Sequence, residues 1–396
     1  MEIISTSQGV GNLCQQIART SKTIEHPFIA IDTEFLREKT YWPHLCLIQI
    51  GFMDKIWIID PLLEEIDLAP FFDLLQNKDI VKVFHAARQD LEIFYHLSDK
   101  LPVPLFDTQI GAMVCGYKES VGYDTLVHDF LSIKLDKSSR ATDWTHRPLS
   151  QDQLNYAADD VRYLAKVYEL MKRRLQKLDR EAWVTEEIAT LTDPGTYQTL
   201  PEEAYKRLKF KKTHPRYLEA LRQMAAWREE EARHHNLARP FIVKDDVIQD
   251  LALLDPETES AARNLRSLKN RPPSTGRLKM LLAALAKARE VPIKDCPSIT
   301  APSLKPIDRH VMNFLKLFLL DVAEKSGVAE KLIATSKELE VFAANPTNSS
   351  HKLRHGWRWE LFGRKAETLL KGELKAFIQE GKLIFEYKSK TESVEN

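Results

Sequence analysis

The stretch FIAIDTEFL, residues 28–36, has the composition of a buried β-strand but carries two carboxylates in its middle. Side chains of a strand alternate between its faces, so Asp32 and Glu34 project to the same side, about 6–7 Å apart along the chain. Two like charges on an otherwise apolar strand are unfavourable unless a positive group lies between them. The stretch therefore predicts a strand whose acidic face is neutralised by something positive.

The composition is that of a globular protein with more than one domain. The chain has 396 residues, of which 43% are hydrophobic, enough for two or three domains with cores of their own. No basic and apolar leader opens the sequence and no run approaches the roughly 18 apolar residues of a membrane span, so we expect a cytoplasmic protein without a membrane partner. The four cysteines are scattered and form no CxxC pair, which argues against disulfides and a zinc site.

The formal net charge is zero, but the two halves of the chain differ in sign. Residues 1–200 contain 21 Lys+Arg and 30 Asp+Glu, a net charge of −9, whereas residues 201–396 contain 36 and 27, a net charge of +9. An acidic half joined to a basic half fits a metal site beside a surface that attracts a polyanion such as nucleic acid. Two solvated faces would give the same counts, so charge alone leaves both interpretations open.

The first part of the chain alternates strand-like and helix-like patterns. Strands are predicted at 28–35, 45–52, 56–62 and 79–86, and helices at 88–97, after Asp107 within 105–117, and at 151–178. Strands followed by helices in this order predict an α/β domain with a mixed sheet and flanking helices. We assign this domain, with a linker, to residues 1–200.

The second part of the chain has helical periodicity. Apolar residues recur with the period of a helix at 216–236, 245–254, 275–289, 308–327 and 363–381. A proline-rich stretch at 291–306 divides the region, so we predict two small all-α modules, 208–292 and 307–384, and a disordered tail at 388–396. Basic residues that could contact phosphates cluster at 206–212 and at Arg263, Arg266, Lys269, Arg271, Arg277 and Lys279.

Three further side chains join the two acids of the opening stretch. Asp90 falls in the first turns of the helix predicted at 88–97, and Tyr156 and Asp160 are four residues apart on one face of the long helix. Carboxylates are the ligands that Mg²⁺ and Mn²⁺ prefer, and two such ions about 3.5–4 Å apart can activate a water and stabilise the leaving oxygen of a phosphodiester. Four acids and a tyrosine suit this chemistry, and the tyrosine is better placed to orient water than to act as a strong base.

With these motifs the chain resembles the ribonuclease D family, part of the DEDD superfamily of 3′→5′ exonucleases that share an RNase H-like fold. AIDTEF, HAARQDLEIF and YAADDVRYL resemble its three motifs, and the third has the tyrosine of one subclass where another has histidine. The segments TYWPHLCLIQIG, LFDTQIGA and LDKSSRATDWTHRPLS also resemble the family. The two helical modules resemble HRDC domains, which are auxiliary nucleic-acid-binding units.

The resemblance implies roles for individual residues. The ligands of two divalent cations, Mg²⁺ or Mn²⁺, would be Asp32, Glu34, Asp90 and Asp160, and Tyr156 would position the attacking water. Substrate contacts are expected from Lys137, Arg140, His85, Tyr41 and Trp42, the last two by stacking on terminal bases. A solvated loop is the alternative for Lys137 and Arg140, and a structural histidine at a strand end is the alternative for His85.

The predicted function is a metal-dependent 3′→5′ exoribonuclease that releases 5′-mononucleotides. The resemblance implies that its partner is RNA with a free 3′ end, and that it trims tRNA precursors and other small structured RNAs; we expect a monomer. A DNA-directed proofreading-type exonuclease is one alternative, because the carboxylates do not distinguish the sugars. A non-catalytic RNA-binding scaffold is another, although no motif acid is replaced.

Overall fold

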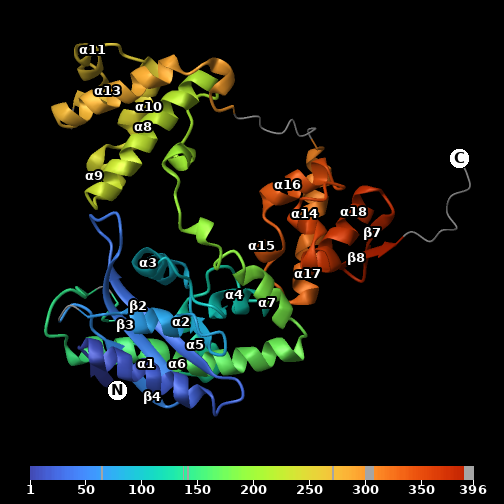
Figure 1. Cartoon of the computed structure of the whole chain (residues 1–396). Helices are drawn as coiled ribbons and strands as arrows, with labels where there is room; N and C mark the ends of the chain where they lie inside the picture. Colours follow the sequence, from blue (N-terminus) through green and yellow to red (C-terminus); the bar gives the residue numbers. More distant parts are fainter. Residues whose placement is uncertain (64–65, 137, 141, 270–271, 299–306, 388–396) are drawn as a thin grey trace, which may run out of the picture.

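The computed structural model describes residues 1–396 except 64–65, 137, 141, 270–271, 299–306 and 388–396. It consists of an N-terminal α/β domain followed by two helical modules (Figure 1). Lys137, Arg271 and the predicted tail 388–396 lie outside the described residues. In the described part of the chain, none of the helices combines the length and the apolarity that crossing a bilayer would need.

A six-stranded mixed sheet forms the centre of the N-terminal domain, in the order β1-β4-β3-β2-β5-β6. β3 is antiparallel to β2 and β4, whereas the other three pairs are parallel. The strands are β1 Glu2–Ile4, β2 Phe28–Leu36, β3 His44–Phe52, β4 Lys55–Ile59, β5 Val81–Phe84 and β6 Leu105–Asp107. The predicted mixed sheet is confirmed; β1 and β6 are too short for the alternation of a strand to be visible in the sequence.

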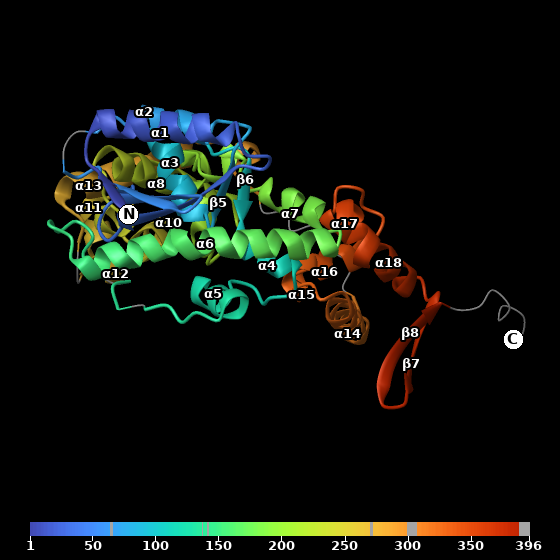
Figure 2. The same cartoon turned by 90° about the horizontal axis from the view of Figure 1, so that it is seen from below.

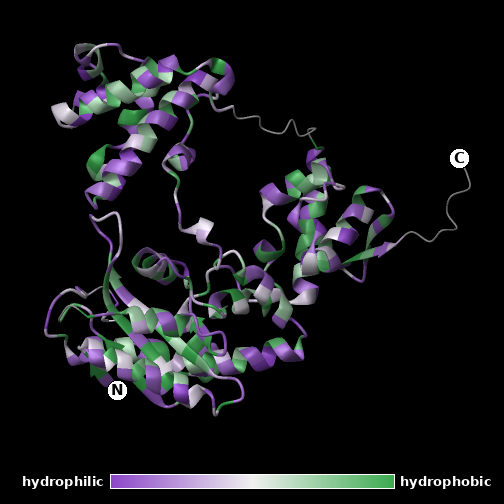
Figure 3. Cartoon of the chain, in the orientation of Figure 1, coloured by the Kyte–Doolittle hydropathy of each residue, from purple (hydrophilic) through white to green (hydrophobic). Residues whose placement is uncertain are grey.

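Helices cover both faces of this sheet. α1 and α2 lie on one face, and the long helix α6 crosses the other, with α5 beyond it (Figure 2). Ile29 and Ile31 of β2 join the core that contains α1 and α3, whereas Ala30 packs with Val161 of α6. Hydrophilic residues mark the last turns of α6 (Figure 3). The helices are α1 Ser7–Ser21, α2 Ala69–Leu75, α3 Arg88–Ser98, α4 Thr108–Val114, α5 Tyr123–Leu131, α6 Gln151–Lys177 and α7 Glu181–Ile188.

The first helical module has a core of its own. α8 packs against α10 and α13, and their buried residues form a cluster separate from the core of the sheet. Two 3₁₀ segments, Pro194–Thr196 and Pro201–Arg207, lead into it from α7. Its helices are α8 Pro215–His234, α9 Arg239–Ile242, α10 Asp245–Leu254, α11 Glu259–Arg263, α12 Arg266–Lys269 and α13 Thr275–Glu290, and a 3₁₀ turn follows at Ile293–Asp295.

The second module shares its core with the N-terminal domain. The Ala329 amide donates to the Met113 carbonyl at 3.0 Å, and the Trp357 ring stacks on Trp183 with centroids 4.8 Å apart. Its elements are α14 Arg309–Ser326, α15 Glu330–Ile333, α16 Ser336–Ala344, a 3₁₀ turn at Lys352–Arg354, α17 Gly356–Arg358, a π-helical stretch at Trp359–Gly363, α18 Arg364–Leu370, β7 Leu374–Gln379 and β8 Lys382–Tyr387.

The predicted helix at 363–381 is wrong beyond Leu370. α18 ends there, and β7 and β8 form an antiparallel hairpin. Gly372 and Gly381 both have positive φ, the conformation that ends a helix and closes a tight turn. The second module is therefore not wholly helical, although the fold class, an α/β domain followed by helical modules, is confirmed. The domain boundaries at 200, 208–292 and 307–384 stay predictions.

Candidate active site

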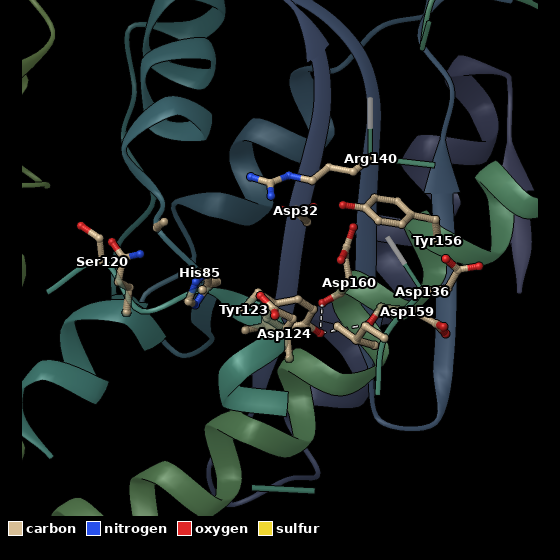
Figure 4. Close-up of a pocket in the computed structure, with 15 residues that line it drawn as sticks. Asp32, His85, Ser120, Tyr123, Asp124, Asp136, Arg140, Tyr156, Asp159 and Asp160 are labelled. Carbon is tan, nitrogen blue, oxygen red and sulfur yellow. Dashed lines mark hydrogen bonds between the residues drawn. The ribbon is translucent and has the colours of Figure 1, made fainter. Parts of the chain in front are cut away.

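Three carboxylates from two elements meet on one face of the sheet. Asp32 and Glu34 lie on β2 and Asp160 lies on α6, and one oxygen of each lies within 4.8 Å of the other two. Figure 4 shows Asp32 and Asp160 at the same cavity, with Tyr156 beside them. The structure thus brings together three of the four acids that the sequence singles out.

Small residues on two strands allow α6 to lie close to this face. Gly51 of β3 is paired with Ala30 of β2, and a Cβ added to Gly51 would lie 3.1 Å from the carbonyl oxygen of Val161. α6 starts at a capping box formed by Ser150 and Gln153, which fixes its first turn. Because α6 lies close to the sheet at Gly51, Asp160, which directly precedes Val161, can reach the acids of β2.

Asp90 lies outside this cluster but close enough for its charge to act on Asp32 and Glu34. It is buried in the first turn of α3, and the Thr33 hydroxyl donates to its Oδ1 at 2.5 Å. Thr33 stands between the two acids of β2, so this bond ties α3 to the same part of the strand. Asp107 fixes the turn before α3, because its carboxylate accepts from the amides of Ala86 and Ala87 at 3.1 and 2.9 Å. Asp107 is thus a structural residue.

Burial raises the pKa of every acid in this group, and repulsion within the group adds to it for Asp32 and Glu34. Burial, and then the neighbouring carboxylates, raise the pKa of Glu34 to about 9 and the pKa of Asp32 well above its ordinary range. Burial also raises the pKa of Asp160 to about 8 and that of Asp90 to about 7, against the hydrogen bond from Thr33. A divalent cation would favour the ionised forms. Without one, the cluster retains protons near neutral pH.

The donor set fits a hard divalent cation. All three clustered ligands are carboxylate oxygens, which Mg²⁺ and Mn²⁺ prefer. Oxygens bound about 2.1 Å from one Mg²⁺ lie within about 4.2 Å of each other. Since the oxygens of Asp32, Glu34 and Asp160 already lie within 4.8 Å, small side-chain rotations bring them to coordination distance.

A cavity of about 380 Å³ opens over the acids and is lined by Asp32, Tyr156, Asp160 and Arg140, with His85 on the opposite side (Figure 4). Arg140 counteracts the rise in pKa of Glu34 and Asp160, so its positive charge acts on the cluster. Burial, and then Asp160, raise the pKa of the Tyr156 phenol above its ordinary value. Tyr156 therefore stays protonated at neutral pH and can donate a hydrogen bond.

The other side of the cavity contains two residues to which the sequence assigned no role. Gln109 and Tyr123 contribute to its lining. The Tyr123 hydroxyl donates to the Asp160 carbonyl at 2.7 Å and so fastens α5 to α6. His85 lines the cavity, its Nδ1 lies 3.0 Å from the Thr108 hydroxyl, and burial lowers its pKa. The structural and the substrate-binding roles of His85 are therefore compatible. Lys137 lies outside the described residues.

Tyr41, predicted to stack on a terminal base, has its ring buried between two domains. Tyr41 is 6% exposed, its hydroxyl donates to Glu229 of α8, and the Arg239 guanidinium lies 4.8 Å from its ring centroid. Trp42 is half-buried and stacks on His96 of α3, with centroids 3.8 Å apart. Neither aromatic belongs to the lining of the cavity over the acids.

Comparison with known proteins agrees with this geometry. Residues 1–176 match the 3′-5′ exonuclease domain family, and residues 218–272 match the HRDC domain. Ribonuclease D of Bartonella henselae is 45% identical over 359 residues, which cover 90% of this chain and 88% of that protein. Ribonuclease D of Nitrobacter hamburgensis is 40% identical over 384 residues, which cover 97% and 99%. The chain belongs to the ribonuclease D family.

A solved structure extends the likeness to the whole arrangement of domains. The crystal structure of Escherichia coli RNase D, described as an exoribonuclease involved in structured RNA processing, matches with a TM-score of 0.79 and 29% identity, over 93% of this chain and 98% of that one. The predicted family and enzyme class, a hydrolase of the ribonuclease D type with a 3′→5′ exonuclease domain and an HRDC domain after it, are confirmed.

Proposed function

We propose that this protein is a divalent-metal-dependent 3′→5′ exoribonuclease that releases 5′-mononucleotides from the 3′ ends of tRNA precursors and other small structured RNAs. The meeting of Asp32, Glu34 and Asp160, with oxygens within 4.8 Å beside a cavity, carries the proposal. Membership of the ribonuclease D family supports RNA as the substrate, and the Escherichia coli enzyme's role in structured RNA processing supports the kind of RNA. The cytoplasmic location and the monomeric state stay predictions.

In the proposed mechanism, the four acids would hold the divalent cations. Divalent cations supply the charge that lowers the pKa of a water and stabilises the leaving oxygen of the phosphodiester. Asp32, Glu34 and Asp160 would be direct ligands, and Asp90, held by Thr33, would complete the set.

The neutral side chain of Tyr156 has a different task. Since its phenol stays protonated, it donates a hydrogen bond that orients the attacking water instead of removing its proton. Arg140 offsets the negative charge of the phosphate. The water attacks the phosphorus and the P–O3′ bond breaks. This leaves a 3′ hydroxyl on the shortened RNA and a 5′-phosphate on the released nucleotide.

The first helical module would hold the body of the RNA. Some of its basic side chains pair with acids on the surface, such as Lys211 with Asp250 at 2.8 Å and Arg263 with Glu259 at 2.6 Å. Exposed ion pairs of this kind are worth little, so phosphates can replace the acids. Binding through such contacts should weaken as salt is raised.

The proposal is tested with a 3′-extended tRNA precursor and the purified protein in Mg²⁺ or Mn²⁺. We expect shortening by one nucleotide at a time, and we expect Asp32→Asn and Asp160→Asn to abolish it while RNA binding in a gel-shift assay persists. Asp152→Asn is the matched control, because Asp152 is exposed in the first turn of α6. Cleavage by the Asp32→Asn protein, or by the wild type in chelator, would overturn the metal assignment.

A DNA strand of the same sequence and overhang separates the alternatives. Equal or faster cleavage of DNA would favour the proofreading-type exonuclease. Binding of the RNA without cleavage of either substrate would favour the non-catalytic scaffold.

A further inference from the structure

Gln49 of β3 is a fully buried glutamine whose amide has no partner among the described residues. Its exposed fraction is 0%, and both Oε1 and Nε2 lack a hydrogen bond. Buried polar side chains are normally paired, and an unpaired one is unfavourable by about 1–3 kcal/mol. An amide of this kind inside a core therefore needs an explanation.

The register of the sheet places this amide next to the acidic cluster. Gln49 is the direct partner of Asp32 across the antiparallel pair β2–β3, and Ile58 is its partner on β4. Directly opposite residues of such a pair have side chains on one face, with Cβ atoms about 5 Å apart. A glutamine amide spans that separation without movement of the backbone, so of the two partners across the strands Asp32 is the one that can accept its hydrogen bond.

Neighbours on the same strand show that this face is the one under α6. Leu47, two residues before Gln49, clusters with Ala157, and Gly51, two residues after it, meets the backbone of Val161. Residues two apart on a strand share a face, so Gln49 lies beneath the segment of α6 that carries Asp160.

We propose that Gln49 is a positioning residue of the metal site, whose side-chain N–H donates to the Asp32 carboxylate and holds it in the orientation that binds the cation. The inference rests on the proposed metal site. Groups that orient a metal ligand in this way typically change metal affinity or activity about 10–100-fold when they are removed. In that orientation the Asp32 carboxylate also gives the buried amide of Gln49 the partner that it otherwise lacks.

Gln49→Met tests the proposal, because methionine has a similar length and no polar group to bury. The metal-free variant should melt at or above the wild-type temperature, since removal of an unpaired buried amide is neutral or stabilising. Its dissociation constant for Mn²⁺, measured by calorimetry without RNA, should rise about 10–100-fold. On RNA, kcat should fall while KM is unchanged. Gln49→Asn, which keeps an amide too short to reach Asp32, should weaken Mn²⁺ binding in the same direction and serves if Gln49→Met does not fold.

Gln76→Met is the matched control. Gln76 donates to the Leu101 carbonyl at 2.6 Å, so its replacement should lower the melting temperature and leave Mn²⁺ affinity unchanged. Wild-type Mn²⁺ affinity in both Gln49 variants would overturn the proposal and assign Gln49 to packing. If Asp32→Asn still loses Mn²⁺ binding in that case, the proposed metal site stands. If the wild type and Asp32→Asn bind Mn²⁺ equally, both proposals fail.

Discussion

Tyr41→Phe removes three hydrogen bonds between the exonuclease domain and the first helical module, because the Tyr41 hydroxyl also accepts from Arg233 and Arg239 at 3.2 and 3.1 Å. The Tyr41 hydroxyl donates to Glu229, a fully buried carboxylate that also accepts two bonds from Arg239 at 2.6 and 2.7 Å. Phenylalanine keeps the ring beside Arg239. A hydrogen bond to a charged group contributes about 1.5–3 kcal/mol. Because Arg233 and Arg239, which lose the hydroxyl as an acceptor, both still pair with Glu229, we expect the lower value for the whole set, about 1.5 kcal/mol, or roughly a tenfold change in the docking equilibrium.

Two backbone amides report this docking directly. The Ala238 amide donates to the Lys39 carbonyl at 2.8 Å, and the Trp42 amide donates to Asn236 Oδ1 at 3.0 Å, so both bonds join the two domains. In Tyr41→Phe, native-state hydrogen exchange of these amides should be about tenfold faster. The amide of Leu221, in the middle of α8, should keep its rate because the module itself stays folded.

Tyr217→Phe is the matched control for this measurement. The Tyr217 hydroxyl accepts from the Lys211 amide at 3.2 Å within the first module, so its removal deletes a buried hydroxyl away from the interface. Wild-type exchange at both reporter amides in Tyr41→Phe would refute the interdomain role. Equal acceleration at Leu221 would refute it too, because the module would then be unfolding instead of undocking.

Two further predictions concern the acids and the helix above them. Burial and repulsion raise the folded-state pKa of Glu34 to about 9 and that of Asp160 to about 8, so between roughly pH 4 and 9 the folded metal-free protein holds more protons than the unfolded chain. Its melting temperature in chelator should therefore fall from pH 6 to pH 9, and an equal fall in Glu34→Gln would contradict this cause. Gly51→Ala should destabilise the protein by about 1–3 kcal/mol and slow cleavage, because the new Cβ meets the Val161 carbonyl and displaces α6. Gly11→Ala in α1, where an added Cβ meets nothing within 4 Å, is its control, and wild-type stability and activity in Gly51→Ala would show that α6 can adjust.

The acids of the site could be predicted because each part of the site is local in sequence. Asp32 and Glu34 share a face through the period of a strand, and Tyr156 and Asp160 share one through the period of a helix. Neither period predicts that β2 and α6 pack against each other. That step came from the resemblance of the motifs to the ribonuclease D family, and the structure supplies its physical cause in the small residues at Ala30 and Gly51.

Residues whose surroundings come from distant parts of the chain could not be assigned from the sequence. Tyr41 lies in a polar connection and looks available for stacking, but the carboxylate that covers its hydroxyl is 188 residues away. Gln49 lies in an apolar run, LCLIQIGF, and the neighbouring residues do not indicate that its amide is unpaired and next to an acid. The hairpin at β7 and β8 is different, because Gly372 precedes its first strand and Gly381 lies in its turn, and both are visible in the sequence.

The position of the interdomain contact connects the first helical module to the acids of the candidate site. Arg37, the first residue after β2, donates to both carboxylate oxygens of Glu92 at 2.7 and 2.9 Å and to the Tyr41 carbonyl at 3.2 Å. Glu92 lies on α3, two residues after Asp90. The connection that holds the first module is therefore bonded to both elements that carry Asp32, Glu34 and Asp90. Because all of these bonds are made by one short segment after β2, we expect a displacement of the first helical module to act on β2 and α3 together.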